Sequence, residues 1–128
     1  MIYLDTSVLL AWLFAEDRCP PESMWSQVLV SSRLLEFEVF NRLHARVTGH
    51  THARAARLLL DRVRLLEMVP TVLGRALSPF APPVRTLDAL HLASMDFLRS
   101  QGQTLSLATY DLRLAAAAQS MGFALAEV

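Results

Sequence analysis

Short apolar runs that end in polar or turn-forming residues predict the strands of this chain. Residues 1–4 are apolar and are followed by Asp5, Thr6 and Ser7. A buried strand that leads into a helix cap has this pattern. Residues 28–30 are likewise short, apolar and rich in valine. Strands are therefore expected at residues 1–4, 28–30, 68–70, 104–109 and 123–128.

Apolar residues at helical spacing predict the helices between these strands. In residues 34–47 the apolar positions recur every three or four residues, and Gly49 is expected to end this helix. Pro20, Pro21 and Glu22 are expected to open a helix, because proline is accepted in a first turn. Helices are therefore expected at residues 7–14, 34–47, about 52–66, 87–100 and 111–122, with two more that begin at about residue 22 and at Thr71. Thr86 is expected to cap the helix at 87–100 and Gly102 to end it, and Asp111 and Gly122 are expected to open and end the last helix.

The order of these elements predicts the fold class. Strands alternate with helices along most of the chain, and residues 78–85 form a proline-rich loop. Such alternation is typical of a parallel sheet that is covered by helices on both faces. We expect an α/β fold, a three-layer α/β/α sandwich with a mainly parallel central sheet of four to five strands, in one domain over residues 1–128.

Composition and charge narrow the classes of function. Cys19 is the only cysteine, which excludes a cysteine-based zinc or iron–sulfur cage. The 12 basic residues are all arginine and balance 12 acidic ones, so the net charge is zero. We therefore do not expect a protein that binds nucleic acid through its overall charge. Residues 42–64 nevertheless hold six arginines against Asp61, which gives a local charge of +5. The apolar run 8–15 is too short to span a membrane, and we expect a cytoplasmic protein.

Three aspartates fall where a parallel sheet would bring them together. Asp5 ends the first strand, Asp88 lies in the first turn of a helix, and Asp111 follows the fourth strand. Ligands of open parallel sheets bind beyond the carboxyl ends of the strands, and these positions meet at that edge. Glu38 could lean over the same edge from its helix, whereas Glu36 points about 160° away at 100° per residue.

Each acid also has a purely structural interpretation as a helix cap or a helix-dipole partner, and Glu38 could pair with Arg42. As a set, however, several carboxylates within a few ångströms repel unless a cation compensates them. Oxygen ligands select Mg²⁺ or Mn²⁺. A cluster of carboxylates with such a cation, in a chain without a phosphate-binding glycine loop, is typical of phosphodiester hydrolysis. The chain has neither GxxxxGK[ST] nor GxGxxG.

Four segments carry a resemblance to a known family: IYLDTSVLLAWLF, SSRLLEFEVFNRL, RTLDALHLASM and TYDLRLAAAAQSMGF. In these segments the chain resembles the PIN-domain ribonucleases, and within them the VapC-like toxins of bacterial toxin–antitoxin pairs. The resemblance spans nearly the whole chain. It implies that Asp5, Glu38, Asp88 and Asp111 are the catalytic and metal-binding acids, and that Thr6, Ser7 and Thr109 support them.

The resemblance also implies cofactors and partners. These are Mg²⁺ or Mn²⁺, an RNA substrate, a homodimer, and a small cognate antitoxin that forms a heterotetramer or larger complex with the toxin. Arg42 and Arg46 lie nearest to Glu38 in the basic stretch, so they are the candidate RNA-binding residues.

The remaining candidates have weaker signals. His91, three residues after Asp88, is expected to be a structural hydrogen-bonding residue, and Asp96 to have a surface or supporting role. His50 and His52 are not expected to form a metal pair, because residues two apart do not share a helix face.

Two other functions are compatible with the sequence. One is a housekeeping nuclease or phosphatase that uses the same acids. The other is a non-catalytic RNA- or protein-binding module, in which the acids only cap helices.

Overall fold

The computed structural model describes residues 1–47 and 49–128. Its centre is a single five-stranded sheet, in which the strands follow the order β3-β2-β1-β4-β5 and every neighbouring pair is parallel. The strands are β1 (Ile2–Leu4), β2 (Leu29–Ser32), β3 (Val63–Leu66), β4 (Ser106–Ala108) and β5 (Ala124–Leu125). The expected parallel sheet is therefore confirmed.

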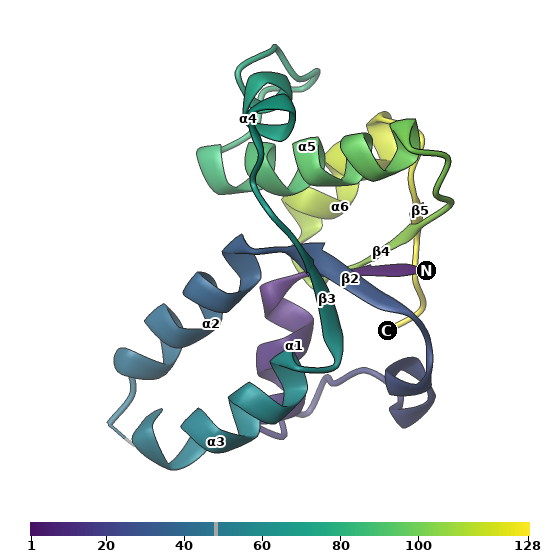
Figure 1. Cartoon of the computed structure of the whole chain (residues 1–128). Helices are drawn as coiled ribbons and strands as arrows, with labels where there is room; N and C mark the ends of the chain where they lie inside the picture. The colour runs from purple at the N-terminus through teal and green to yellow at the C-terminus, as the bar shows by residue number, and fades with distance from the viewer. Residues whose placement is uncertain (48) are drawn as a thin grey trace.

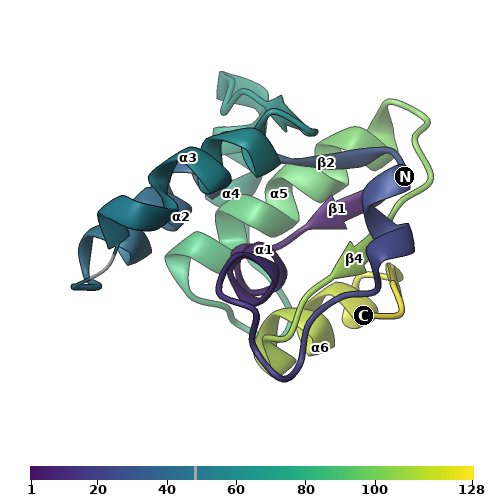
Figure 2. The same ribbon diagram turned by 90° about the horizontal axis from the view of Figure 1, so that it is seen from below.

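Helices cover both faces of this sheet, which confirms the expected three layers (Figure 1). One side carries α1, α2 and α3, and the other carries α5 and α6, with α4 packed on α5 (Figure 2). The helices are α1 (Thr6–Leu13), the 3₁₀ helix η1 (Glu22–Ser26), α2 (Leu34–His44), α3 (Gly49–Leu60), α4 (Pro70–Ala76), α5 (Thr86–Ser100) and α6 (Leu112–Ser120).

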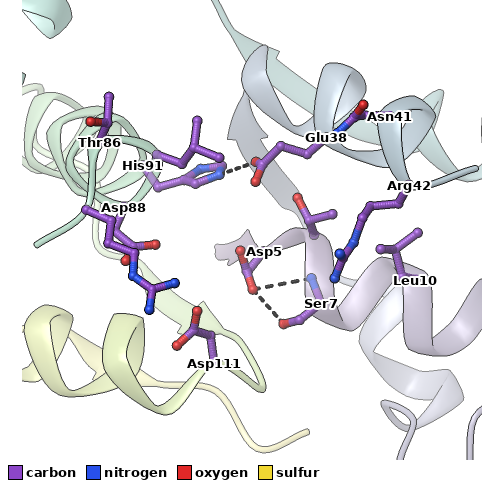
Figure 3. Close-up of a pocket in the computed structure, with 13 residues that line it drawn as sticks. Asp5, Ser7, Leu10, Glu38, Asn41, Arg42, Thr86, Asp88, His91 and Asp111 are labelled. Atoms are coloured by element: carbon purple, nitrogen blue, oxygen red, sulfur yellow. Dashed lines mark hydrogen bonds and ion pairs between the residues drawn. The ribbon is translucent and has the colours of Figure 1, made fainter. Parts of the chain in front are cut away.

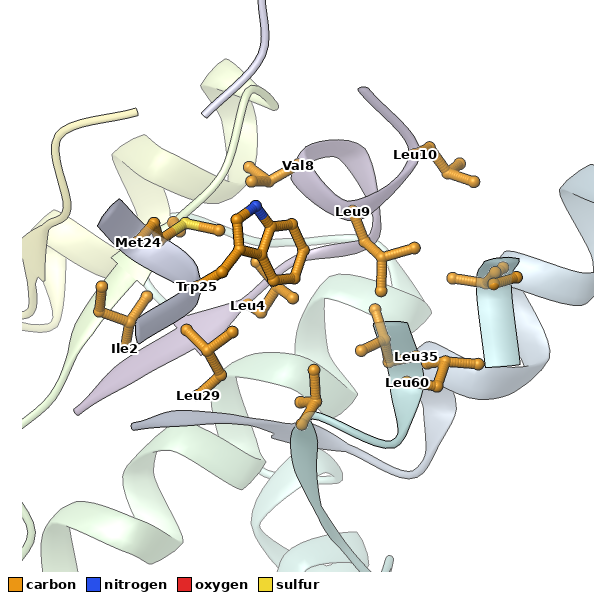
Figure 4. Close-up of a cluster of buried hydrophobic side chains, with 14 of the residues drawn as sticks. Ile2, Leu4, Val8, Leu9, Leu10, Met24, Trp25, Leu29, Leu35 and Leu60 are labelled. Carbon is orange, nitrogen blue, oxygen red and sulfur yellow. The ribbon is translucent and has the colours of Figure 1, made fainter. Parts of the chain in front are cut away.

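The alternation of side chains along β1 builds two separate cores. Ile2 and Leu4 enter the core shared with α1, α2 and α3, where Trp25 also packs (Figure 4). Tyr3 points to the opposite face and packs with Leu92 and other residues of α5 and α6. Successive strand residues face opposite sides of a sheet, so three consecutive buried residues require a helix layer on each side.

The region after α2 differs from the expectation. The predicted helix at 52–66 is two elements, since α3 ends at Leu60 and Val63–Leu66 form β3. All four residues of β3 pair in parallel with β2, and this pairing overrides the helical spacing of the apolar residues. The expected strand at 68–70 is wrong for the same reason, because the edge next to β2 is already filled by β3.

The ends of several helices also differ from the expectation. Gly49 begins α3 rather than ending α2, which stops at His44. Val47, which was expected to belong to that helix, is almost fully exposed. Thr48 lies outside the residues that the structure describes. Thr86 is the first residue of α5 and not its cap. The helix expected after the two prolines is present only as the short 3₁₀ helix η1. Gly102 and Gly122 end their helices as expected, both with positive φ.

The strand order places a crevice at the middle of the sheet. From β1 the chain order runs outward to β2 and β3 on one side, and to β4 and β5 on the other. The chain leaves β1 into α1 on one face and leaves β4 into α6 on the other face. Parallel sheets bind ligands at such a switch point, outside the carboxyl ends of the strands.

Candidate active site

Asp5 follows β1 directly and caps α1. Its Oδ2 atom accepts hydrogen bonds from the backbone N–H of Ser7 (3.3 Å), the Ser7 hydroxyl (2.5 Å) and the Thr109 hydroxyl (2.8 Å). Within residues 1–47 and 49–128, none of the donors reaches Oδ1. Asp5 is therefore a buried carboxylate that is fixed through one oxygen and has the other available to a ligand.

Asp111 has the same arrangement after β4. Its Oδ1 atom caps α6 by accepting from the backbone N–H groups of Arg113 (2.9 Å) and Leu114 (3.2 Å). Its own backbone N–H donates to the hydroxyl of Thr109 (3.0 Å), which also bonds Asp5. Thr109 thus ties the two strand ends together. Capping and ligand binding are compatible in both aspartates, because capping uses one oxygen only.

Asp88 lies in the first turn of α5 and faces the two other aspartates (Figure 3). Partial burial raises the pKa of Asp88 above its ordinary value, and the charges of Asp111 and Asp5 raise it further. His91 and Arg85 offset these effects in part. The carboxylates therefore share one field, in which added negative charge is unfavourable and a cation is favoured.

We expect Asp88→Asn to stabilise the metal-free protein slightly at pH 7. A raised native pKa means that the native state binds more protons than the unfolded state, so this group lowers stability as pH rises. The gain from Asp88→Asn should shrink as pH falls towards the ordinary pKa of aspartate. Thermal unfolding of both proteins in EDTA between pH 4 and pH 7.5 measures this.

Asp96 on the same helix supplies the matched control. Burial alone would raise the pKa of Asp96, but hydrogen bonds from Arg75 (2.9 Å) and Arg99 (2.6 Å) lower it overall. Asp96→Asn should therefore destabilise the protein at pH 7, and this loss should fade at low pH. If Asp88→Asn instead lowers the melting temperature as Asp96→Asn does, then Asp88 serves the helix rather than the site.

Glu38 reaches the pocket from α2 and is held by a chain of buried groups. Its Oε1 atom lies 2.6 Å from Nε2 of His91, and Nδ1 of His91 lies 2.8 Å from the Tyr3 hydroxyl. The backbone N–H of Ser32 donates to the same hydroxyl (3.0 Å). An ionised carboxylate only accepts hydrogen bonds, so Glu38 fixes a proton on Nε2 of His91. This chain gives Glu38 one orientation.

The buried pair of Tyr3 and His91 has shifted acidities. Complete burial raises the pKa of the Tyr3 phenol well above its usual range, so this hydroxyl keeps its proton. Burial alone would lower the pKa of His91. The hydrogen bond and the charge of Glu38, with smaller contributions from Asp5 and Asp88, raise the pKa of His91 overall. The expected structural role of His91 is therefore a specific one, namely orienting Glu38.

All four predicted acids line one pocket of about 600 Å³. Asp5, Asp88, Asp111 and Glu38 approach it from four different elements, as Figure 3 shows. Of the predicted supporting residues, Ser7 and Thr109 bond Asp5 directly. Thr6 also lines the pocket, but its buried hydroxyl has no hydrogen-bond partner in the described part of the chain.

Arginines stand on two sides of this pocket. Arg42 lines it from α2 and Arg85 lines it from the residue before α5. Neither arginine forms an ion pair within the part of the chain that the structure describes. Arg46 does not line this pocket but an adjoining groove. Sequence reasoning missed Arg85, whose one signal was its place just before the LDALHLA segment.

The other polar candidates lie elsewhere. Glu36 turns away from the pocket and pairs with Arg33 (3.5 Å) and Arg57 (3.3 Å), as its helical position predicted. His52 packs edge-on against Phe14, with ring centroids 4.9 Å apart, and does not line the acid pocket. The four acids that line the pocket therefore remain the candidate site.

The donor set fits a hard divalent cation. In the described ranges no three His, Cys, Asp or Glu side chains are already gathered into a metal-ligand group. Among the residues that the structure describes, Asp5 and Asp111 each keep one oxygen without a protein partner, and Asp88 keeps both. Oxygen ligands of this kind suit Mg²⁺ or Mn²⁺ rather than a softer metal.

Comparison with known proteins identifies the family. The profile described as PIN domain matches residues 2–120. The chain belongs to the PIN-domain family. Two curated relatives are ribonucleases of Mycobacterium tuberculosis. Ribonuclease VapC47 (strain CDC 1551 / Oshkosh) is 30% identical over 130 residues, covering 96% of this chain and 93% of the relative. Ribonuclease VapC46 (strain ATCC 25618 / H37Rv) is 35% identical over 129 residues, covering 96% and 94%.

Solved structures share the fold of this PIN-domain protein. VapBC-1 from nontypeable Haemophilus influenzae has a TM-score of 0.63 at 16% identity, with 99% of this chain and 98% of that chain covered. A toxin–antitoxin complex from Klebsiella pneumoniae has a TM-score of 0.60 at 16% identity, with 91% of each chain covered. The VapC-like resemblance of the sequence is confirmed by the curated relatives, which are named as VapC ribonucleases. Among the described residues, no helix is long and apolar enough to cross a membrane.

Proposed function

We propose that this PIN-domain protein is a Mg²⁺- or Mn²⁺-dependent endoribonuclease that acts as the toxin of a toxin–antitoxin pair. The observation that carries the proposal is the pocket at the switch point of the sheet, which Asp5, Glu38, Asp88 and Asp111 line together. Its curated relatives are named as VapC ribonucleases, and its structural neighbours include toxin–antitoxin complexes.

The residues divide the work by their positions. Asp5, Asp88 and Asp111 would hold the cation through oxygens that have no partner among the described residues, and Glu38 completes the set from α2. A divalent cation supplies positive charge that polarises a phosphodiester and acidifies water. Ser7 and Thr109 keep the carboxylate of Asp5 in place, and His91 does the same for Glu38. Preorganised carboxylates avoid reorganisation when the substrate binds.

Arginines at the rim of the pocket suit a polyanionic substrate. Arg42 shares the pocket with the acids, and it pairs with no carboxylate in the described part of the chain. A phosphate is the natural partner of such a guanidinium. Arg46 extends the positive charge along α2 and beyond it. RNA binding through these two arginines is part of the proposal. We also propose that the protein forms a homodimer, and a heterotetramer or larger assembly with a cognate antitoxin.

Metal binding is tested without relying on activity. Saturating Mn²⁺, about 100-fold above its Kd, should raise the melting temperature by roughly 5–10 °C, because the cation binds the folded state and relieves carboxylate repulsion. Asp88→Asn should lose most of this rise. Glu36→Gln, which removes an acid outside the pocket, should keep it in full.

The outcomes separate the competing functions. A melting temperature that does not respond to Mn²⁺ would favour the non-catalytic binding module. A metal response, RNA cleavage and harmless expression in a host that lacks the antitoxin would favour a housekeeping nuclease over a toxin.

A further inference from the structure

A second groove adjoins the acid pocket. It has a volume of about 390 Å³ and shares Ser7, Leu10 and Arg42 with that pocket. Phe14, Arg46 and Tyr110 form its far part. A ligand chain held at the carboxylates can therefore continue into this groove without leaving the surface.

Two arginine–aromatic stacks flank the groove. The guanidinium carbon of Arg46 lies 3.6 Å from the ring centroid of Phe14, and that of Arg18 lies 4.5 Å from the ring centroid of Tyr110. The Arg46 side chain is half exposed, so it is only partly covered by Phe14. Planar guanidinium groups and aromatic rings are the surfaces on which unpaired RNA bases stack.

Two arginines and one acid, Glu16, line the groove, and this balance favours an anionic chain. Arg42 has no ion pair in the part of the molecule that is described, and Arg46 has one long contact of 4.0 Å with Glu16. Both partners of that contact are half exposed, and exposed pairs of this kind contribute little stability. A phosphate can therefore engage both arginines without breaking a strong interaction.

Arg57 on α3 also stacks on an aromatic ring and pairs with a glutamate, but it lies outside the groove. It stacks over Phe40 at 4.4 Å and pairs with Glu36 at 3.3 Å. Its surroundings are a separate depression with Glu36 and Asp61, away from Asp5 and Asp88. If Arg46 merely covered an aromatic ring, Arg46 and Arg57 would behave alike.

We propose that this second groove binds the unpaired ribonucleotide next to the phosphate held at the acid pocket. The guanidinium of Arg46 stacks on the base, and Arg42 pairs with the intervening phosphate. The inference rests on the proposed ribonuclease function. Continuity with the acid pocket and planar stacking surfaces favour a nucleotide over an antitoxin peptide as the occupant.

Binding of RNA without cleavage tests the groove. A fluorescein-labelled single-stranded RNA of ten nucleotides and mixed sequence would be titrated with protein in EDTA, and its anisotropy followed at several salt concentrations. Arg46→Ala should weaken binding about ten-fold, the loss of one stacked base. Arg46→Lys keeps the charge but not the plane, and should resemble Arg46→Ala. Arg42→Ala should reduce the slope of log Kd against log salt by about 0.7.

Arg57→Ala is the matched control and should bind RNA within two-fold of wild type. Both alanine variants lose one arginine–aromatic stack, so similar melting temperatures exclude a folding defect specific to Arg46. Equal RNA affinities of Arg46→Ala and Arg57→Ala would overturn the inference. So would an Arg46→Ala variant that binds RNA normally and the cognate antitoxin weakly, since the groove would then belong to a peptide.

The two proposals fail in different ways. Because binding is measured in EDTA, a wild-type protein that never cleaves RNA but shows the Arg46 dependence would contradict only the proposed function. A protein that cleaves RNA with metal but binds it independently of Arg46 would contradict only the groove.

Discussion

Asp5→Asn is expected to lower the rate of RNA cleavage by about 100- to 1,000-fold while the protein stays folded. The asparagine oxygen can still accept from Ser7 and Thr109, so the cap of α1 survives. Its amide group, however, replaces the second carboxylate oxygen by a donor, which cannot bind a cation. Initial rates on a labelled RNA, together with the circular dichroism spectrum of each protein, measure both parts of this expectation.

Glu36→Gln is the control for Asp5→Asn, because it also removes one negative charge. Glu36 pairs with Arg33 and Arg57 outside the pocket, so cleavage should stay within about two-fold of wild type. An Asp5→Asn protein that cleaves RNA normally would show that the acid pocket is not the active site. Equal damage from both substitutions would point to overall charge instead.

His91→Leu is expected to lower the free energy of unfolding by about 2–3 kcal/mol and to reduce cleavage as well. Leucine leaves the Tyr3 hydroxyl and the Glu38 carboxylate without their partner. A buried polar group without a hydrogen bond costs stability, and an untethered Glu38 loses its orientation towards the pocket. Urea unfolding in EDTA gives the stability, and cleavage rates at saturating metal give the catalytic effect.

His91→Gln separates orientation from bulk stability. The terminal amide of glutamine can donate to Glu38 from nearly the position of the imidazole Nε2, although it cannot reproduce the contact with Tyr3. It should therefore recover much of the cleavage while remaining less stable than wild type. If the folded His91→Leu protein cleaves RNA as fast as wild type, Glu38 does not depend on His91 for its role.

The topology was predictable because it depends on short-range signals. Asp5 directly follows β1, Asp111 lies shortly after β4, and both precede helices, so their capping and their common edge follow from the local sequence. Over a few residues, a helix and a strand have similar patterns of apolar positions. For this reason β3 could not be predicted from the sequence. Residues 63–66 continue the helical spacing of α3, yet β2 offers an unpaired edge that captures them as β3. Such long-range pairing leaves no local signal.

The residues of the candidate site could be named from the sequence, but the contacts between them could not. The four acids meet in one pocket because their strand-end and helix-start positions converge. Glu38 and His91 lie on different helices and are 53 residues apart in the sequence, and Tyr3 and His91 are 88 residues apart. No spacing rule links residues at such separations. Arg85 was missed for a similar reason, since its loop position alone does not indicate that it borders the pocket.

Cleavage of RNA with and without metal tests the central claim most directly. Purified protein, free of antitoxin, would be incubated with total cellular RNA in EDTA, in Mg²⁺ and in Mn²⁺, beside the Asp5→Asn and Glu36→Gln variants. We predict discrete fragments from wild type and Glu36→Gln in either metal, and none in EDTA or from Asp5→Asn. Fragments that form equally in EDTA, or that Asp5→Asn still produces, would contradict a metal-dependent nuclease built on these carboxylates.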